Sequence, residues 1–145
     1  MAYKNIEITG ASSVLQQASI KTQVYKGFSS VDPKNFNTRL YDFELIKQDI
    51  LNHFKTKKGE RLMNPEFGSI IWDLLMEPLT DQVREALSED ITRICNFDPR
   101  VTPTQIDLKE FPNGYILELT LLLNGTDQAV NLSLTFDQAI GLTVQ

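Results

Sequence analysis

The sequence has only one cysteine, Cys95, and one histidine, His53. A single cysteine cannot form an intramolecular disulfide, which favours a reducing compartment such as the cytoplasm. The two residues also argue against a structural zinc site, which takes four ligands of these types. Core packing is the better explanation of Cys95, and a surface or hydrogen-bonded position is the better explanation of His53.

Long apolar runs and an excess of positive charge are missing as well. No run approaches the roughly 20 apolar residues that span a bilayer, and the first residues lack the apolar core of a secretory signal. The net charge is −5. Five basic and two acidic residues up to position 39 give +3, and nine basic and seventeen acidic residues give −8 for the remainder. Because duplex binding requires clustered positive charge, we expect neither nucleic acid nor a membrane as a partner.

Motifs for chemistry are also absent. No phosphate-binding glycine loop, metal-ligand cluster or Ser/His/Asp arrangement has the required spacing, so we expect no cofactor and no metal. The acids Glu60 and Glu66 leave one enzymatic alternative, a glycosidase, which needs two carboxylates across a sugar-binding cleft. Pairing of these acids with nearby basic residues is the simpler explanation. We therefore predict a protein without catalytic residues.

The distribution of apolar residues divides the chain into an arm, residues 1–38, and a globular domain, residues 39–145. The length suits one domain with a proper core. The arm has too few apolar residues for a core of its own. It is either a disordered tail or a segment that becomes ordered on a partner.

Two amphipathic helices are predicted in the domain, over residues 42–54 and 81–96. Asp42 is placed to cap the first helix. Its apolar residues recur at helical spacing, as do those of the second. The expected inner stripes are Phe43, Ile46, Ile50, Leu51 and Phe54, then Val83, Leu87, Ile91 and Ile94. Asp90 is expected to face water.

After residue 101 the apolar period changes to two, which predicts strands. Turn sequences at 111–115 and 124–127 separate three alternating runs. The expected fold class is therefore α+β, with two main helices packed on a three-stranded antiparallel meander. No Lys, Pro or bulge protects the last strand between Ala129 and Phe136. Either the tail 141–145 or the connector between the helices covers this edge, or another chain adds a strand there.

The connector, residues 57–75, has neither helical period nor alternation. It concentrates charge, a proline, two glycines and the only tryptophan, Trp72. Ordinary connections are short and polar, so a long connector of this kind indicates a functional loop.

The order of these elements and several short motifs resemble a known family. The motifs are Lys58-Gly59-Glu60-Arg61, Asn64-Pro65-Glu66-Phe67-Gly68, Trp72-Asp73-Leu74-Leu75 and Pro78-Leu79-Thr80. Over about residues 39–136 they resemble the sheath-initiator wedge proteins of contractile bacteriophage baseplates, a family that includes the type VI secretion component TssE. Asp98-Pro99-Arg100 stands where that family has Glu-Pro-Arg, with an acid one methylene shorter.

The resemblance implies a structural protein of the virion tail baseplate, assembled in the host cytoplasm. The implied partners are other wedge proteins, contacted through the Glu-Pro-Arg position, tail sheath subunits, and central hub or tube proteins. Some members are described as lysozyme-like, so a peptidoglycan hydrolase is the alternative function. A soluble adaptor unrelated to tails is a third class.

The residues predicted to bind partners fall in three places: the connector 57–75, the corner after the second helix, and the final strand. Pro99 fixes the backbone after the second helix, and Arg100 has the planar fork for a two-pronged carboxylate contact, unless it pairs internally. The open final strand offers main-chain hydrogen bonds to a sheath strand. The full set is Asp98, Pro99, Arg100, Glu60, Arg61, Pro65, Glu66, Phe67, Trp72, Leu132 and Leu134.

Overall fold

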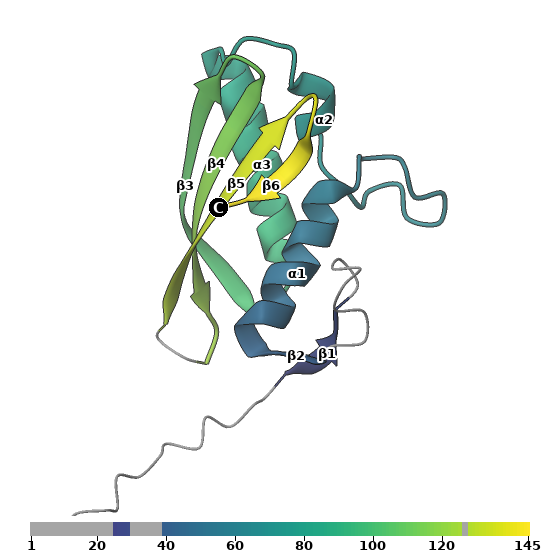
Figure 1. The fold of residues 1–145 in the computed structure, drawn as a ribbon, viewed down its shortest axis with the longest axis vertical. Coiled ribbons are helices and arrows are strands. Elements are labelled where there is room, and N and C mark those ends of the chain that lie inside the picture. The colour runs from purple at the N-terminus through teal and green to yellow at the C-terminus, as the bar shows by residue number, and fades with distance from the viewer. Residues whose placement is uncertain (1–24, 30–38, 126–127) are drawn as a thin grey trace, which may run out of the picture.

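The computed structural model describes residues 25–29, 39–125 and 128–145, and most of the predicted arm lies outside them. These residues form an α+β fold in which helices lie against one face of an antiparallel sheet (Figure 1). The elements are β1 (Lys26–Phe28), β2 (Arg39–Tyr41), α1 (Asp42–Lys55), α2 (Ile71–Leu74), α3 (Asp81–Phe97), β3 (Val101–Phe111), β4 (Gly114–Leu123), β5 (Ala129–Asp137) and β6 (Gly141–Val144). The predicted class is confirmed.

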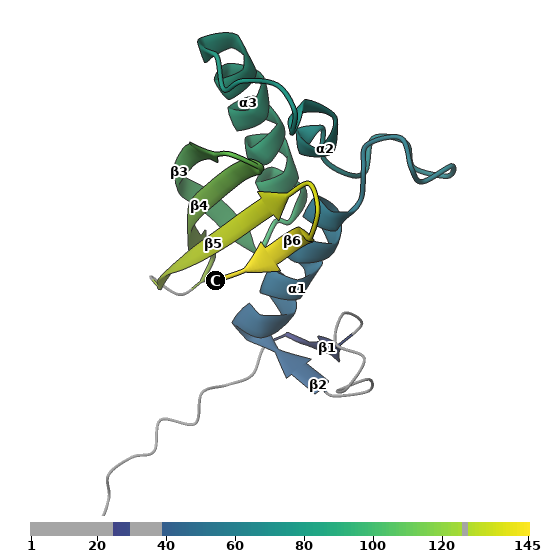
Figure 2. The same cartoon turned by 45° about the horizontal axis from the view of Figure 1, so that its top comes forward.

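The C-terminal sheet has four strands, in the order β3-β4-β5-β6, and not the three that were predicted. All neighbours are antiparallel. The fourth strand, β6, is formed by the short tail, which turns back at Gly141 with φ +89°. It pairs only with Leu134–Asp137, the second half of β5 (Figure 2). Of the alternatives for the last strand, the tail therefore covers half of the edge.

The core lies between this sheet and the two long helices. Alternate residues of β4, namely Tyr115, Leu117, Leu119 and Leu121, are at most 1% exposed, as the period of two requires. The predicted stripes of α1 and α3 pack against them, with Phe43 and Val83 at the margin. Cys95 is fully buried, as predicted, and burial raises the pKa of its thiol to about 12. No described helix is long and apolar enough to cross a bilayer.

The start of α1 differs from the prediction. Tyr41 is the N-cap residue, and Asp42 has a positive φ of +47°. Aspartate tolerates this left-handed conformation better than most residues. Its Oδ1 accepts a hydrogen bond from the Tyr25 backbone N–H at 3.0 Å, and the Asp42 N–H donates to the Tyr25 carbonyl at 3.0 Å. This reciprocal pair fixes β1, which pairs with β2, to the start of the helix.

Candidate functional site

The connector between α1 and α3 is a protruding loop with a rigid base. Its two ends meet where Lys57 and Ser69 form a parallel bridge, with the Ser69 N–H donating to the Thr56 carbonyl at 2.9 Å. Gly68, at φ +113°, is required there, because a Cβ would lie 2.7 Å from the Lys57 carbonyl carbon and oxygen. The tip carries Leu62 and Met63, which are 94% and 98% exposed.

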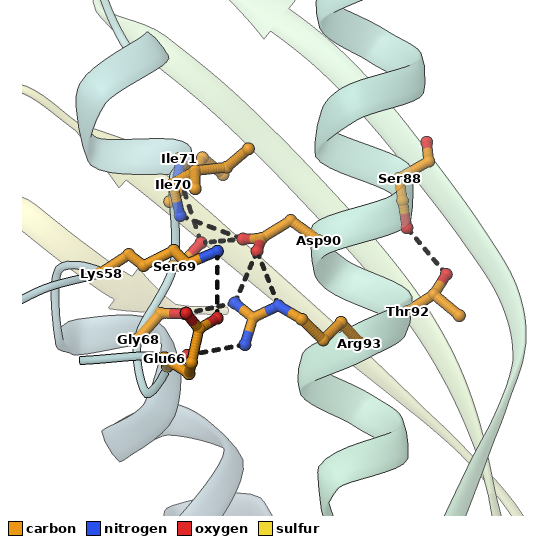
Figure 3. A network of polar contacts seen from close by, with 10 residues as sticks. All are labelled: Lys58, Glu66, Gly68, Ser69, Ile70, Ile71, Ser88, Asp90, Thr92 and Arg93. Carbon is orange, nitrogen blue, oxygen red and sulfur yellow. Dashed lines mark hydrogen bonds and ion pairs between the residues drawn. The ribbon is translucent and has the colours of Figure 1, made fainter. Parts of the chain in front are cut away.

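Asp90 on α3 holds the base of this loop (Figure 3). It is 6% exposed, although the sequence predicted that it faces water. Its Oδ2 accepts hydrogen bonds from the Ser69 hydroxyl and the Ile70 N–H, both at 3.0 Å. The spacing Leu87, Asp90, Ile94 continues the apolar stripe of the helix, so position 90 faces inward. This helical spacing could have identified Asp90 as a buried residue from the sequence.

Arg93, one turn further along α3, joins the loop to Asp90. Its Nε and Nη2 donate to Asp90 Oδ1 at 3.1 and 2.6 Å. Its Nη1 and Nη2 also donate to the carbonyls of Glu66 and Gly68 at 2.8 and 2.7 Å. A buried carboxylate is stable when charge-assisted hydrogen bonds satisfy it, and all the donors to Asp90 belong to the loop or to Arg93. The network therefore fixes the loop on the helix.

The corner after α3 is braced from within. Arg100 donates to Asp98 through Nε at 2.8 Å and through Nη2 at 2.5 Å, and Nη2 also reaches Asp49 on α1 at 2.6 Å. Asp98 is 9% exposed, whereas Pro99 is exposed and its carbonyl accepts from the Asn124 amide at 2.7 Å. The internal pairing considered as an alternative for Arg100 is present. Its fork is used inside the fold, and only Nη1 has no acceptor among the described residues.

The electrostatics of the corner follow from this pairing. Burial acts to raise the pKa of the Asp98 carboxyl, but hydrogen bonds from the Arg100 side chain and backbone outweigh it, so the pKa is lowered. The hydrogen bond to Asp98 raises the pKa of the Arg100 guanidinium, despite desolvation. Both groups are therefore charged near neutral pH.

An aromatic cluster lies between the loop and the corner. His53 stacks on Phe67 with ring centroids 3.9 Å apart and meets the edge of Phe97 at 5.1 Å. It is 3% exposed, and its Nε2 has no hydrogen-bond partner among the described residues, so the predicted surface or hydrogen-bonded position is wrong. An unsatisfied buried nitrogen costs about 1–3 kcal/mol. Burial and the Arg93 charge lower the pKa of His53 to about 4, which keeps the ring neutral.

A hollow of about 460 Å³ opens beside this cluster. It is lined by Asp49, Ile50, Asn52, His53, Arg61, Phe67, Ile94, Phe97, Asp98, Pro99 and Arg100. It thus brings together five of the residues predicted to bind partners: Arg61, Phe67, Asp98, Pro99 and Arg100. The sequence did not identify Asp49 or His53 as part of this site, because their contacts depend on how the helices pack.

The other predicted residues lie elsewhere. Glu60, Pro65 and Glu66 are exposed on the protruding loop. Glu60 accepts from the Lys57 N–H at 3.0 Å, and Glu66 lies 3.5 Å from the Lys58 ammonium. Local pairing thus accounts for both acids, and neither lines the hollow.

Three of the predicted residues turn inward. Trp72 donates from Nε1 to the Phe54 carbonyl at 2.7 Å and packs its ring on Phe136. The side chains of Leu132 and Leu134 are 2% and 0% exposed, so they belong to the core. These three side chains are therefore used inside the fold, because the apolar face of β5 and the indole ring are needed there.

The chain is similar to a known protein family, to a phage protein and to a solved structure. Residues 42–128 match the family model described as "Baseplate wedge protein gp25". The chain is 27% identical over 101 residues to baseplate wedge protein gp25 of Enterobacteria phage T4. This alignment covers 65% of this chain and 76% of that protein. A solved structure from Geobacter sulfurreducens, described as a candidate tail lysozyme, superposes with a TM-score of 0.55 at 19% identity, covering 62% of this chain and 85% of the other. At that identity the likeness concerns the fold alone.

Proposed function

Because the family match over residues 42–128 spans more than half of the sequence, the chain belongs to the gp25 family of baseplate wedge proteins, and we propose that it starts the tail sheath by offering a sheet edge. In this proposal it is a structural component of a phage tail baseplate. It binds other wedge proteins at the corner and sheath subunits at β5.

The observation that carries the proposal is the half-open edge of β5. Beyond its pairing with β6, the stretch Ala129–Ser133 has a strand on only one side, β4, among the described residues. The Gln145 N–H donates to the Ser133 carbonyl at 3.1 Å, so the backbone of Ser133 faces the β6 side. Residues two apart direct their backbone groups the same way, so Ala129 and Asn131 also face that side, beyond the end of β6.

This geometry suits strand addition. An incoming strand can continue the line of β6 and pair antiparallel with the first half of β5. The bonds are made by main-chain groups, which all sequences share, so the edge can template a polymer. The limited length of the open stretch also explains how the free protein protects its edge, since short edges pair poorly with one another.

The corner is the proposed contact with other wedge proteins. Pro99 is exposed, and Nη1 of Arg100 is left as a donor after Asp98 and Asp49 have taken the rest of the fork. A partner carbonyl or carboxylate at Nη1 would add one charge-assisted bond to a guanidinium that is already oriented.

We propose no catalytic cycle. The likeness to the candidate tail lysozyme extends to the fold alone, and the two acids that a hydrolase would need, Glu60 and Glu66, are exposed and locally paired. A glycosidase acid works in a cleft that raises its pKa, and neither position provides one.

Replacing Asn131 by proline tests the sheath role. Proline removes the N–H at position 131, which faces the open edge, and leaves the β4 ladder intact. We expect a folded protein that enters baseplates but gives particles with at least tenfold fewer sheaths, counted by electron microscopy. Proline at Leu132 or Leu134 would instead remove bonds to β4, because the backbone at those positions faces β4.

The matched control is Asn131→Val, which also loses the 3.0 Å bond between Thr120 and the Asn131 side chain but keeps the backbone N–H. This variant should assemble sheaths normally. Normal sheaths on particles that contain the folded proline variant would refute strand addition at this edge.

A further inference from the structure

The strand at the other margin of the sheet, β3, is also an edge strand. It pairs with β4 on one side, and no strand lies on its other side among the described residues (Figure 1). The register shifts between Pro103 and Gln105, and the chain turns at Pro112. Residues 105–111 are left in regular register along this edge, a longer stretch than the open part of β5.

Alternate residues of this stretch direct their backbone groups away from β4. The Leu108 carbonyl accepts a hydrogen bond from Nη1 of Arg84 on α3 at 3.0 Å, so it points to the open side. The register agrees, because Leu117, which lies opposite Leu108 on β4, faces β5 with its backbone. Residues two apart direct their backbone groups the same way, so Ile106 and Glu110 also face the open side.

This edge is complementary to itself. A second copy that pairs antiparallel, with the register centred on Leu108, places Leu108 opposite Leu108 and Ile106 opposite Glu110, and all these residues direct their backbone groups at the seam. Asp107 of one copy then lies opposite Lys109 of the other, and the two-fold axis repeats this pair. Cross-strand pairs of opposite charge are favourable. Residues 105–111 contain no proline, so every position has an N–H.

We infer that the β3 edge is a docking surface for a second copy of this chain and that Arg84 blocks it in the free protein. The Arg84 guanidinium occupies the Leu108 carbonyl, which two copies need for the central pair of hydrogen bonds. A second β3 must therefore displace a charge-assisted bond in each copy. The block confines strand addition to β5, the margin opposite β3, where we propose that the sheath starts.

The contrast between the two edges supports a guard over an incidental contact. Natural sheets protect their edges with prolines, bulges and charged side chains. On β3 the proline and the irregularity after Pro103 limit the open stretch, and Arg84 covers its centre. On β5, residues 129–136 contain neither proline nor lysine, and their register with β4 has no shift. Only one edge of the sheet is thus protected by its own side chains.

Sedimentation of the isolated full chain tests the guard. Arg84→Ala should form a dimer whose dissociation constant is at least tenfold lower than that of the native chain. Arg84→Met, which keeps the apolar stem but cannot donate, should behave the same. Arg84 is exposed, so both variants are expected to fold. Either change makes the net charge more negative than −5, which opposes association, and Lys55→Ala, the matched loss of charge on α1, should not dimerise.

Changes added to Arg84→Ala locate the seam. Glu110→Pro removes an N–H that faces the open side and should restore the monomer, whereas Glu110→Gln, which loses only the charge, should leave the dimer intact. Asp107→Lys should weaken the dimer, since it places like charges opposite each other at position 109. In the dimer, amide exchange at Ile106 and Glu110 should be slower than in the native chain.

If Arg84→Ala and Arg84→Met sediment as the native chain does, Arg84 is no guard. A dimer that survives Glu110→Pro would show that the copies meet elsewhere and would overturn docking at β3. These measurements use the isolated protein and concern β3 alone. They can therefore fail while the Asn131→Pro result stands, and the reverse also holds.

Discussion

Replacement of Asp90 by alanine should lower the free energy of unfolding by about 3 kcal/mol. Removing one partner of a buried ion pair typically costs about 3–5 kcal/mol, and the lower end applies because the Arg93 side chain is 35% exposed. The change also leaves the Ser69 hydroxyl and the Ile70 N–H, both inside the loop base, without their acceptor. Thermal and urea denaturation at pH 7 measure the loss, which corresponds to roughly 10 °C in Tm.

The same variant should loosen the loop before it loosens the helices. Without Asp90, Arg93 loses the group that orients it toward the Glu66 and Gly68 carbonyls. Amide exchange should therefore accelerate most at Ser69 and Ile70 under conditions where the domain stays folded. Glu89→Ala removes an exposed acid from the adjacent position and should change stability by less than about 0.5 kcal/mol.

Equal losses in the two variants would mean that the net charge of α3, and not the network, determines stability. A loss near 3 kcal/mol with unchanged exchange at Ser69 and Ile70 would show that the loop is held by its own base bonds alone. Either result would contradict the conclusion that the hydrogen bonds of Asp90 and Arg93 fix the loop on α3.

The periodicity of apolar residues was sufficient to predict the long helices and strands, but it was insufficient to predict which part of the sheet edge is open. The helical stripes and the alternation in β4 follow from burial on one face, which leaves a direct pattern in the sequence. β6 has only four residues, too few for a pattern to be decisive, and its pairing depends on the reversal at Gly141. The open edge was thus placed on the right strand, but it was expected over Ala129–Phe136, whereas β6 leaves only Ala129–Ser133 without a second neighbour.

The candidate site could be predicted only in part for a similar reason. The family resemblance pointed to the corner and to Arg61 and Phe67, and these residues do meet around the hollow. Asp49 and His53 lie on α1, more than 40 positions before the corner residues, so no local sequence pattern connects them with the corner. For Asp90, the polarity of the residue suggested a solvated face, whereas its place on the apolar stripe was the stronger evidence.

The second large effect is expected at the corner. Arg100→Ala should destabilise the fold by roughly 2–3 kcal/mol at pH 7, since it removes charge-assisted bonds to the buried Asp98 and a bond to Asp49. Arg100→Lys should recover only part of this, because an ammonium group cannot reproduce the fork. Lys55→Ala removes the same charge from an exposed position and should be nearly neutral.

The pH dependence separates this brace from ordinary packing. Asp98 has a folded-state pKa below its ordinary value of 3.8, because the bonds from Arg100 outweigh burial. A lowered carboxyl pKa adds stability that is fully present above the unfolded value and is lost as the pH falls through the folded one. In Arg100→Ala the backbone N–H of residue 100 still donates to Asp98, but the side-chain hydrogen bonds and the charge of the guanidinium are lost, so less opposes the effect of burial, which raises the pKa of Asp98.

The stability gap between the native protein and Arg100→Ala should therefore be largest near neutral pH and should narrow as the pH falls below about 4. Urea denaturation between pH 3 and 7 measures it. A gap that stays constant over this range would mean that Arg100 acts through the contact of its guanidinium with the Tyr25 ring and not through Asp98. In that case the hydrogen bonds from Arg100 to Asp98 would add no net stability, and the corner would not be braced by its ion pair.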